Sequence, residues 1–207
     1  MGRYNFDKIV DRKHTKSLKY DFAVQRGKPA DVLPFWVADM DFEIPSELKQ
    51  VLLDRVNHGI FGYTESDDAY FNVLKEWFAS RFNWNIDKKW LVKTPGVVFA
   101  LAMAVRSFTK EGEGVLINQP VYYPFSMVID DNDRNLINVP LIQGADTYTI
   151  DFEGVERAIV EHNVTLFLLC NPHNPVGRVW TEDELKRLGD ICIKHNVIII
   201  SDEIHAD

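Results

Sequence analysis

From about residue 90 onwards the sequence alternates short apolar runs with segments of helical periodicity, and this alternation limits the fold more than any other feature. The predicted strands cover residues 90–93, 115–118, 136–139, 165–170 and 197–201. The predicted helices cover residues 96–109, 122–131, 151–162 and 181–195. Such alternation is typical of βαβ units, whose parallel strands form one sheet with helices on both faces. We therefore predict a three-layer α/β fold with a mostly parallel sheet.

The last apolar run ends in an acid. Val197 is followed by three isoleucines and Ser201. A strand without polar alternation is typical of the interior of a parallel sheet, so we predict that it is buried on both faces. Asp202 follows at the carboxyl end of that strand, where open α/β sheets bind their ligands. Because an unpaired buried carboxylate is costly, we expect a cation to face Asp202.

The composition limits the classes of partner. The 207 residues carry a formal net charge of −8, which disfavours binding to nucleic acid or to an anionic membrane. No apolar stretch approaches the roughly 18 residues of a membrane span. The first residues lack the apolar core of a signal peptide, so we predict a cytoplasmic protein. Cys170 and Cys192 lie in apolar segments and are predicted to be buried thiols.

The part of the chain before residue 90 is less regular. Residues 1–33 show no sustained periodicity and are predicted to form an arm that packs on another surface. Pro45 and Ser46 open a predicted helix that ends at Gly59. A second helix is predicted to start at residues 66–68, with an apolar face formed by large side chains.

Two predicted strand ends carry candidate ligand contacts. Pro95 and Gly96 lead into a helix whose first backbone N–H groups would be free to bind an anion, although a plain turn can have the same sequence. Tyr122 lies between Pro120 and Pro124 at another strand end. Its ring is suited either to stacking on a flat ligand or to packing in the core.

A third loop, Asn-Pro-His-Asn-Pro-Val-Gly at residues 171–177, is the most specific motif in the chain. Each asparagine precedes a proline, which disfavours helical backbone at the asparagine and removes a backbone donor. The loop directly follows the apolar run at 165–170, so its amides project from the end of a strand. Stiff loops at strand ends commonly position a ligand.

Together these motifs resemble those of the pyridoxal-phosphate enzymes of the aspartate aminotransferase fold, the class I/II aminotransferases. The resemblance is closer to the MalY/PatB-type subgroup, the C–S β-lyases related to cystathionine β-lyase. It rests on Trp-Val-Ala-Asp-Met-Asp-Phe at 36–42, Phe-Gly-Tyr-Thr at 61–64, the loop at 171–177, and Ser-Asp-Glu-Ile-His at 201–205. In this fold the Gln119–Pro120 and Asn174–Pro175 bonds are expected to be cis.

The resemblance assigns four residues to the ring of a pyridoxal-phosphate cofactor. Asp202 would pair with the pyridinium nitrogen and keep it protonated. Asn174 would donate a hydrogen bond to the phenolic oxygen of the ring, and Tyr122 would stack on its face. His205 stands where many aminotransferases have a tyrosine that reaches the same oxygen.

Five further residues are assigned by the same resemblance. The backbone amides of Val97 and Val98 would hold the cofactor phosphate. Tyr63 would reach the phosphate bound by a neighbouring subunit, which implies a homodimer with sites at the interface. Ala38 and Asp39 would approach the carboxylate of a small amino-acid substrate.

The resemblance also implies that the chain is the front part of a longer protein. The Schiff-base lysine of the family would lie beyond Asp207, and Lys186 and Lys194, on a predicted helix, do not suit that role. No catalytic residue is therefore predicted within the chain, and the 207 residues alone are predicted to be inactive. Residues 1–45 would form the arm and a substrate-side segment, and residues 46–207 an incomplete cofactor-binding large domain.

The whole protein is accordingly predicted to be a pyridoxal-phosphate-dependent C–S β-lyase. It would convert cystathionine or cysteine-type amino acids to pyruvate, ammonia and a thiol. A class I/II aminotransferase is the alternative, because the sequence in hand does not decide between elimination and transamination.

Two other classes stay open. A metal-dependent hydrolase would use Asp202, Glu203, His205 and Asp207, although successive strand residues point to opposite faces and do not converge easily. A regulatory or binding module is the other, since a fold does not fix a function. A dinucleotide-binding enzyme is disfavoured, because the Gly-Glu-Gly at 112–114 precedes a strand instead of following one.

Overall fold

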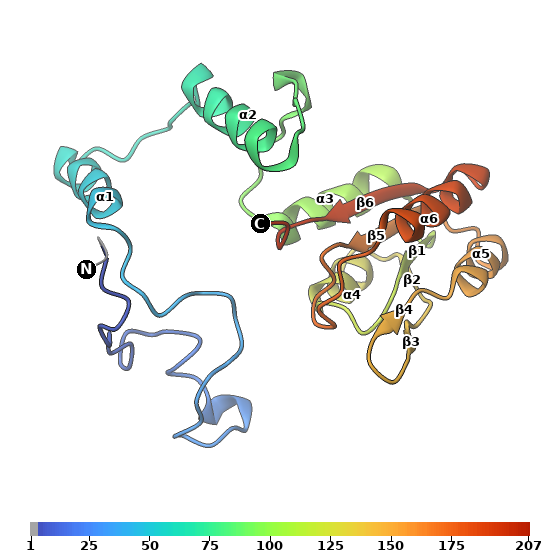
Figure 1. Ribbon diagram of the computed structural model, residues 1–207, viewed down its shortest axis with the longest axis horizontal. Coiled ribbons are helices and arrows are strands. Elements are labelled where there is room, and N and C mark those ends of the chain that lie inside the picture. The colour runs from blue at the N-terminus through green and yellow to red at the C-terminus, as the bar shows by residue number, and fades with distance from the viewer. Residues whose placement is uncertain (1–3) are drawn as a thin grey trace. The chain divides into compact units, whose positions relative to one another are not determined.

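The computed structural model describes residues 4–207, which form two compact units (Figure 1). The first unit ends at Glu65, and the second covers Ser66–Asp207. The second unit contains all of the predicted α/β repeat. The predicted division after residue 45 concerns the domains of a longer protein, and it stays a prediction.

The second unit is built on a four-stranded parallel sheet. Its strands are β1 (Gly114–Ile117), β2 (Asn135–Asn138), β5 (Leu166–Cys170) and β6 (Ile198–Asp202). They lie in the order β2-β1-β5-β6, and all neighbouring strands are parallel. Four of the five predicted strands are confirmed. A short antiparallel pair, β3 (Ile142–Gln143) and β4 (Tyr148–Thr149), lies outside the predicted pattern.

Helices cover both faces of this sheet, as predicted (Figure 1). They are α3 (Val97–Phe108), α4 (Pro124–Asp130), α5 (Phe152–Glu161) and α6 (Glu182–Lys194). Successive residues of β5 point to opposite faces. Phe167 packs in the apolar cluster that includes α5 and α6, and Leu168 packs in the cluster that includes α3 and α4. Because all five residues of β5 are buried, this strand lies at the centre of the core.

The start of α6 is set by a capping box, as predicted. The Thr181 hydroxyl accepts a hydrogen bond from the Glu184 backbone N–H at 3.2 Å, and the Glu184 carboxylate accepts one from the Thr181 N–H at 2.8 Å. Each side chain thereby satisfies a backbone donor that the helix itself leaves unpaired.

Two predictions about strands are wrong. Residues 90–93 form no strand, because the Asp87 side chain accepts from the Lys89 N–H at 3.0 Å and stabilises a 3-10 turn, η2 (Lys88–Trp90). Strand β6 is not buried on both faces. It is the last strand of the sheet within the described residues and pairs with β5 alone, which leaves Ile198 41% exposed.

The first two α-helices of the chain form where the sequence predicts them. They are α1 (Ser46–His58), in the first unit, and α2 (Asp68–Phe82), in the second. Gly59 ends α1 in a left-handed conformation with φ of 76°, and the Asp67 side chain caps α2 by accepting from the Tyr70 N–H. No residue of either helix is buried. Helical periodicity and capping signals therefore predicted these helices, although none of their residues is buried.

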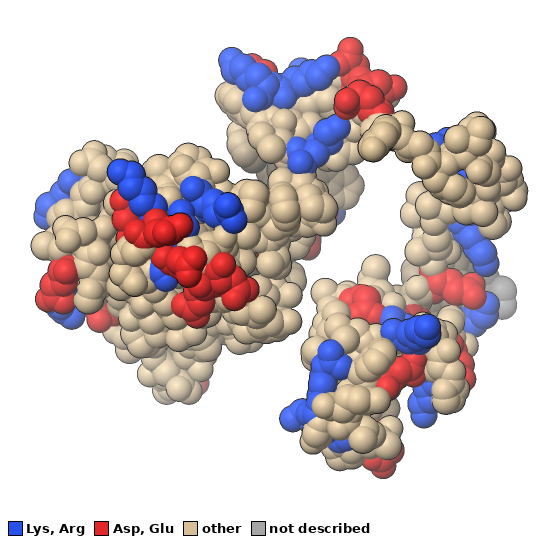
Figure 2. All heavy atoms as spheres, turned by 180° about the vertical axis from the view of Figure 1, so that it is seen from behind, with Lys and Arg blue, Asp and Glu red and all other residues tan. Residues whose placement is uncertain are grey.

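Charged side chains of both signs are interspersed on the face shown in Figure 2. Several form ion pairs, such as Lys194 with Glu156 at 2.7 Å across α6 and α5. None of the helices within residues 4–207 is long and apolar enough to cross a membrane.

Both cysteines are free and buried, as predicted. Burial raises the pKa of the Cys192 thiol to about 11, so this thiol is neutral at pH 7. Cys192 belongs to the apolar cluster between the sheet and α5 and α6, and it acts there as a small apolar side chain.

Candidate functional site

Several candidate residues gather at one edge of the sheet. Strands β1, β5 and β6 are parallel, so the loops that follow them lie at the same carboxyl edge. Helix α3 packs along β5 and β6 (Figure 1). Because α3 leads back into β1, its N-terminus points toward the same edge. The structure thus brings together the loop carrying Tyr122, the loop at 171–177, Asp202 and the start of α3.

Asp202 ends β6 and is only 6% exposed. One carboxylate oxygen accepts a hydrogen bond from the Ile204 N–H at 3.1 Å. Among the described residues, no Lys, Arg or His forms an ion pair with this carboxylate. A buried carboxylate that keeps most of its accepting capacity is suited to a cationic or protonated group of a ligand.

The loop at 171–177 is fixed to β6 and folded back on β5. The Asn171 N–H donates to the Asp202 carbonyl at 3.0 Å, and the Asn171 side-chain oxygen accepts from the Trp180 N–H at 3.1 Å. The indole N–H of Trp180 donates to the Cys170 carbonyl, also at 3.1 Å. The Asn174–Pro175 bond is cis, as predicted, and the Asn171–Pro172 bond is cis as well.

The side-chain amide of Asn174 makes no hydrogen bond to another described residue, so it is available to a ligand. Its backbone N–H lies 3.4 Å from the Cys170 sulfur, which places the residue directly beyond the end of β5. Burial raises the pKa of the Cys170 thiol, and the nearby charge of Asp202 adds to this effect. The thiol is therefore neutral at pH 7.

Tyr122 lies in the loop after β1. The residue is 37% exposed, and its ring lies 5.2 Å from the ring of Tyr123, edge to face. The Gln119–Pro120 bond in the same loop is cis, as predicted. The Phe125 N–H donates to the Tyr122 carbonyl at 3.0 Å as α4 begins. Tyr122 is therefore not enclosed in the core.

The start of α3 offers backbone donors. Gly96 precedes the helix with a φ of 149°, a backbone conformation that residues with a side chain rarely adopt. The Gly96 carbonyl accepts the first helical hydrogen bond, from the Ala100 N–H at 3.1 Å. The N–H groups of Val97 and Val98 precede that bond and have no acceptor among the described residues. They point outward with the positive end of the helix dipole, which favours an anion.

The residues after Asp202 are exposed and do not converge. His205 and Glu203 are both exposed, and the Glu203 carboxylate accepts from the Ser201 hydroxyl at 2.8 Å. Asp207 pairs with Arg81 at 2.5 Å. Within residues 4–207, no group of three or more His, Cys, Asp or Glu side chains is arranged to hold a metal ion.

Three predicted residues belong to the first unit. Tyr63 is fully exposed there. The Asp39 carboxylate bonds to the Arg12 guanidinium, and the Asp39 carbonyl accepts from Lys19 at 3.1 Å. Ala38 is exposed and follows Val37, whose φ of 62° is unusual for a β-branched residue. The Asp39 side chain is therefore engaged within its own unit.

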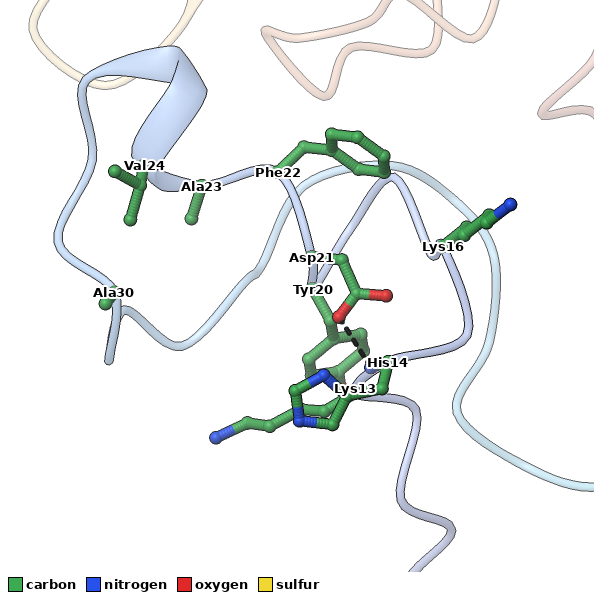
Figure 3. Close-up of a pocket in the computed structure, with 9 residues that line it drawn as sticks. All are labelled: Lys13, His14, Lys16, Tyr20, Asp21, Phe22, Ala23, Val24 and Ala30. Carbon is green, nitrogen blue, oxygen red and sulfur yellow. Dashed lines mark hydrogen bonds between the residues drawn. The ribbon is translucent and has the colours of Figure 1, made fainter.

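The first unit also contains a surface hollow of about 480 Å³ (Figure 3). Three of the residues that line it are basic, namely Lys13, His14 and Lys16. The Asp21 carboxylate on its wall accepts from the His14 N–H at 2.8 Å, and this bond lowers the pKa of Asp21. Asp21, the acid that lines the hollow, is therefore already engaged in a local turn of the first unit.

Two residues of the strand-edge site carried no role in the sequence analysis. His173 and Trp180 are each 3% exposed, and their rings meet edge to face at 5.4 Å. His173 lies inside the Asn-Pro motif, so its position was a usable signal. Trp180 lies beyond that motif, and no local pattern indicated that its indole returns to the end of β5.

The fold and this edge together define a class of protein. Free amides at the start of a helix suit a phosphate, an accessible tyrosine suits a flat ring, and a buried carboxylate suits a protonated ring nitrogen. Groups of this kind at one sheet edge are suited to a ligand that combines a phosphate with a flat, protonated ring. The chain belongs to the aminotransferase class I and II family, whose model matches residues 30–207.

Two individual relatives support the assignment to this family. The chain is 43% identical over 203 residues to cystathionine β-lyase PatB of Bacillus subtilis (strain 168), an alignment that covers 98% of this chain and 52% of PatB. It is 36% identical over 205 residues to protein MalY of Escherichia coli (strain K12), covering 99% of this chain and 53% of MalY.

A solved structure also resembles this chain. The crystal structure of cystalysin from Treponema denticola, which contains a pyridoxal 5'-phosphate cofactor, matches with a TM-score of 0.88 and 41% identity. The match covers 97% of this chain and 52% of the cystalysin chain. The chain thus spans about half the length of the relatives it matches.

Proposed function

We propose that the whole protein carrying this sequence is a pyridoxal-phosphate-dependent C–S β-lyase. It would act on cystathionine or cysteine-type amino acids and release pyruvate, ammonia and a thiol. The observation that carries the proposal is the Asp202 carboxylate, which is buried at the end of β6 without a cation among the described residues. The similarity to PatB, a cystathionine β-lyase, favours this activity over others of the same family.

The residues at the sheet edge fit pyridoxal phosphate. The free N–H groups of Val97 and Val98 would hold the phosphate, and the Tyr122 ring would stack on the pyridine ring. The Asn174 amide would donate to the phenolic oxygen. When bound, pyridoxal phosphate supplies an electron sink that stabilises negative charge at the substrate α-carbon.

Asp202 holds a proton on the pyridine nitrogen in this proposal. The carboxylate is buried, so its attraction for the protonated nitrogen is screened less than it would be in water. The Ile204 N–H at 3.1 Å fixes the orientation of the carboxylate. The Asn171 N–H at 3.0 Å from the Asp202 carbonyl ties the acid to the loop that carries Asn174.

Other parts of the proposal concern the protein beyond this site. The backbone at Ala38 and Asp39 would bind the carboxylate of a small amino-acid substrate. Tyr63 would reach the phosphate of a second subunit in a cytoplasmic homodimer. His205 would have an accessory role at the phenolic oxygen. The Schiff-base lysine is expected beyond Asp207, so the 207 residues alone are expected to be inactive.

The cofactor part of the proposal is tested by titrating the whole protein with pyridoxal phosphate. A visible absorption band should appear as the cofactor binds. Asp202→Asn should raise the dissociation constant roughly tenfold or more, since it removes one charge-assisted contact. Glu203→Gln, at the exposed acid next along the chain, is the matched control and should change nothing. A wild-type protein that binds no pyridoxal phosphate would refute the proposal.

The reaction part needs a separate experiment. Pyruvate released from cystathionine without a keto-acid acceptor would support the lyase. A strict requirement for the acceptor would instead assign the aminotransferase, which the family model also fits.

A further inference from the structure

The proposed function gives no role to His173, the histidine of the 171–177 loop. It is 3% exposed and lies between the two Asn-Pro pairs. Its Nε2 atom lies 3.0 Å from the carbonyl oxygen of Pro120, in the loop after β1. Its Nδ1 atom is buried and has no hydrogen-bond partner among the described residues. The polar contact of the ring therefore joins two loops that follow different strands.

The geometry fixes the protonation of this ring. A carbonyl oxygen only accepts hydrogen bonds, so Nε2 must carry the proton and donate it to Pro120. A second proton, on Nδ1, would bury a positive charge and an N–H group without an acceptor. Burial accordingly lowers the pKa of His173, and the ring is neutral at pH 7.

The other side of the His173 ring is held by a rigid support. The Trp180 ring packs edge to face against it at 5.4 Å, and the Trp180 indole N–H is fixed on the Cys170 carbonyl at 3.1 Å. The Arg178 guanidinium lies 4.8 Å from the centre of the Trp180 ring. That guanidinium bonds to both carboxylate oxygens of Glu184, at 2.6 and 2.7 Å, at the capped start of α6. His173 is thus anchored through Trp180 to the first turn of α6.

We propose that His173 is a positioning residue, whose hydrogen bond to Pro120 holds the loop carrying Tyr122 against the loop carrying Asn174. Asn174 directly follows His173, and Tyr122 lies two residues after Pro120. Side chains on two loops can hold one ring in a fixed geometry only if the loops are fixed to each other. The inference rests on the proposed function, because Tyr122 and Asn174 are the side chains proposed to hold the cofactor ring.

The test compares two substitutions in the whole protein. His173→Phe keeps an aromatic ring against Trp180 and removes the donor to Pro120. It should raise the dissociation constant for pyridoxal phosphate roughly tenfold and shift the visible absorption band of the bound cofactor. His173→Gln keeps an amide that can donate to Pro120 and should stay within about threefold of the wild type. His195→Gln, at a partly exposed histidine that bonds to Glu156, is the matched control and should leave both readouts unchanged.

A second measurement does not depend on the cofactor. Nitrogen-15 NMR of labelled histidine in the wild-type protein should show His173 as the neutral Nε2-protonated tautomer at pH 7. A ring protonated on Nδ1, or a charged ring, would overturn the inference. Equal binding and an unshifted band in His173→Phe would also overturn it.

The remaining outcomes are equally decisive. If His173→Phe does not fold, wild-type affinity in His173→Gln together with the expected tautomer supports the role, and a tenfold loss in His173→Gln refutes it. A wild-type protein that binds no pyridoxal phosphate would remove both the proposed function and this role. Binding by the wild type that His173→Phe leaves unchanged would remove this role alone.

Discussion

The two units of the chain are held together in different ways. Every buried apolar residue of the described chain lies in the second unit, from Leu101 onwards. In the first unit the one residue of the described part that is buried is Lys19. Its ammonium group bonds to the Asp41 carboxylate at 3.1 Å, and Arg12 bonds to the same carboxylate at 2.6 Å.

This difference has a thermodynamic consequence. Burial of apolar area stabilises the folded state by about 25 cal/mol per Å². Apolar side chains carry no charge, so this contribution involves neither protonation nor screening of charges by salt. Ion pairs that water reaches contribute little each and are screened by salt. We therefore expect the second unit to behave as the stable folded body, and the order of the first unit to depend on its charges.

The largest expected effect contrasts one residue from each unit. Phe167 is fully buried at the centre of β5, so Phe167→Ala should lower the free energy of unfolding by about 3–5 kcal/mol through lost burial and a cavity. Leu52 on α1 is 59% exposed, so Leu52→Ala should change it by no more than about 0.5 kcal/mol. Urea unfolding of the whole protein measures both.

The Leu52 result also sharpens the comparison. A cost of about 2 kcal/mol or more for Leu52→Ala is typical of a buried leucine. Such a cost would show that the apolar face of α1 is covered in the whole protein. A small cost for Phe167→Ala would contradict the description of β5 as the centre of the core.

The sequence predicted local features of both units better than it predicted burial. Local patterns predicted α1 and the capping box at Thr181, because each depends on residues a few positions apart. Burial depends on neighbours far away in the chain, so the apolar run of β6 predicted a strand but not its place at the edge of the described sheet. At 90–93 the side chain of Asp87 stabilised a turn that competes with a strand.

In the candidate site, too, some features could be predicted from the sequence and others could not. Asp202 ends a strand, and Asn174 and Tyr122 lie in loops that follow strands, so topology alone placed all three at one edge of the sheet. The contacts that hold this edge together, from His173 to Pro120 and from Trp180 to Cys170, cross between loops. No spacing in the sequence encodes such a contact, and only the folded chain reveals it.

A smaller effect is expected from helix capping. The Thr181 hydroxyl accepts from the Glu184 N–H at the start of α6, so Thr181→Ala should lower the free energy of unfolding by about 1 kcal/mol. Ser46→Ala at the start of α1 is the matched change in the first unit. No side chain caps the start of α1, so this change should cost no more than about 0.5 kcal/mol. Equal losses in the two variants would contradict the contrast between the units.

The smallest effect is confined to the first unit and appears only in acid. Hydrogen bonds from Arg12 and, with a smaller effect, from Lys19 lower the pKa of Asp41 from its ordinary value of 3.8 to about 2. A lowered pKa means that the unfolded segment takes up a proton more readily than the folded one. The stabilisation is therefore complete above the ordinary value and is lost as the pH falls from about 4 through about 2.

Hydrogen exchange monitored by mass spectrometry can locate this loss, once rates are corrected for the intrinsic effect of pH. Residues 12–41 should keep their protection at pH 5 and lose it between about pH 4 and pH 2, whereas β5 should stay protected at pH 4. Asp41→Asn should remove the protection of the segment already at pH 5. Asp54→Asn, at an acid of α1 that bonds to Gln50, should leave it intact. If the segment keeps its protection in Asp41→Asn, the first unit must be held by contacts other than this charge cluster, and the contrast between the two units would have to be revised.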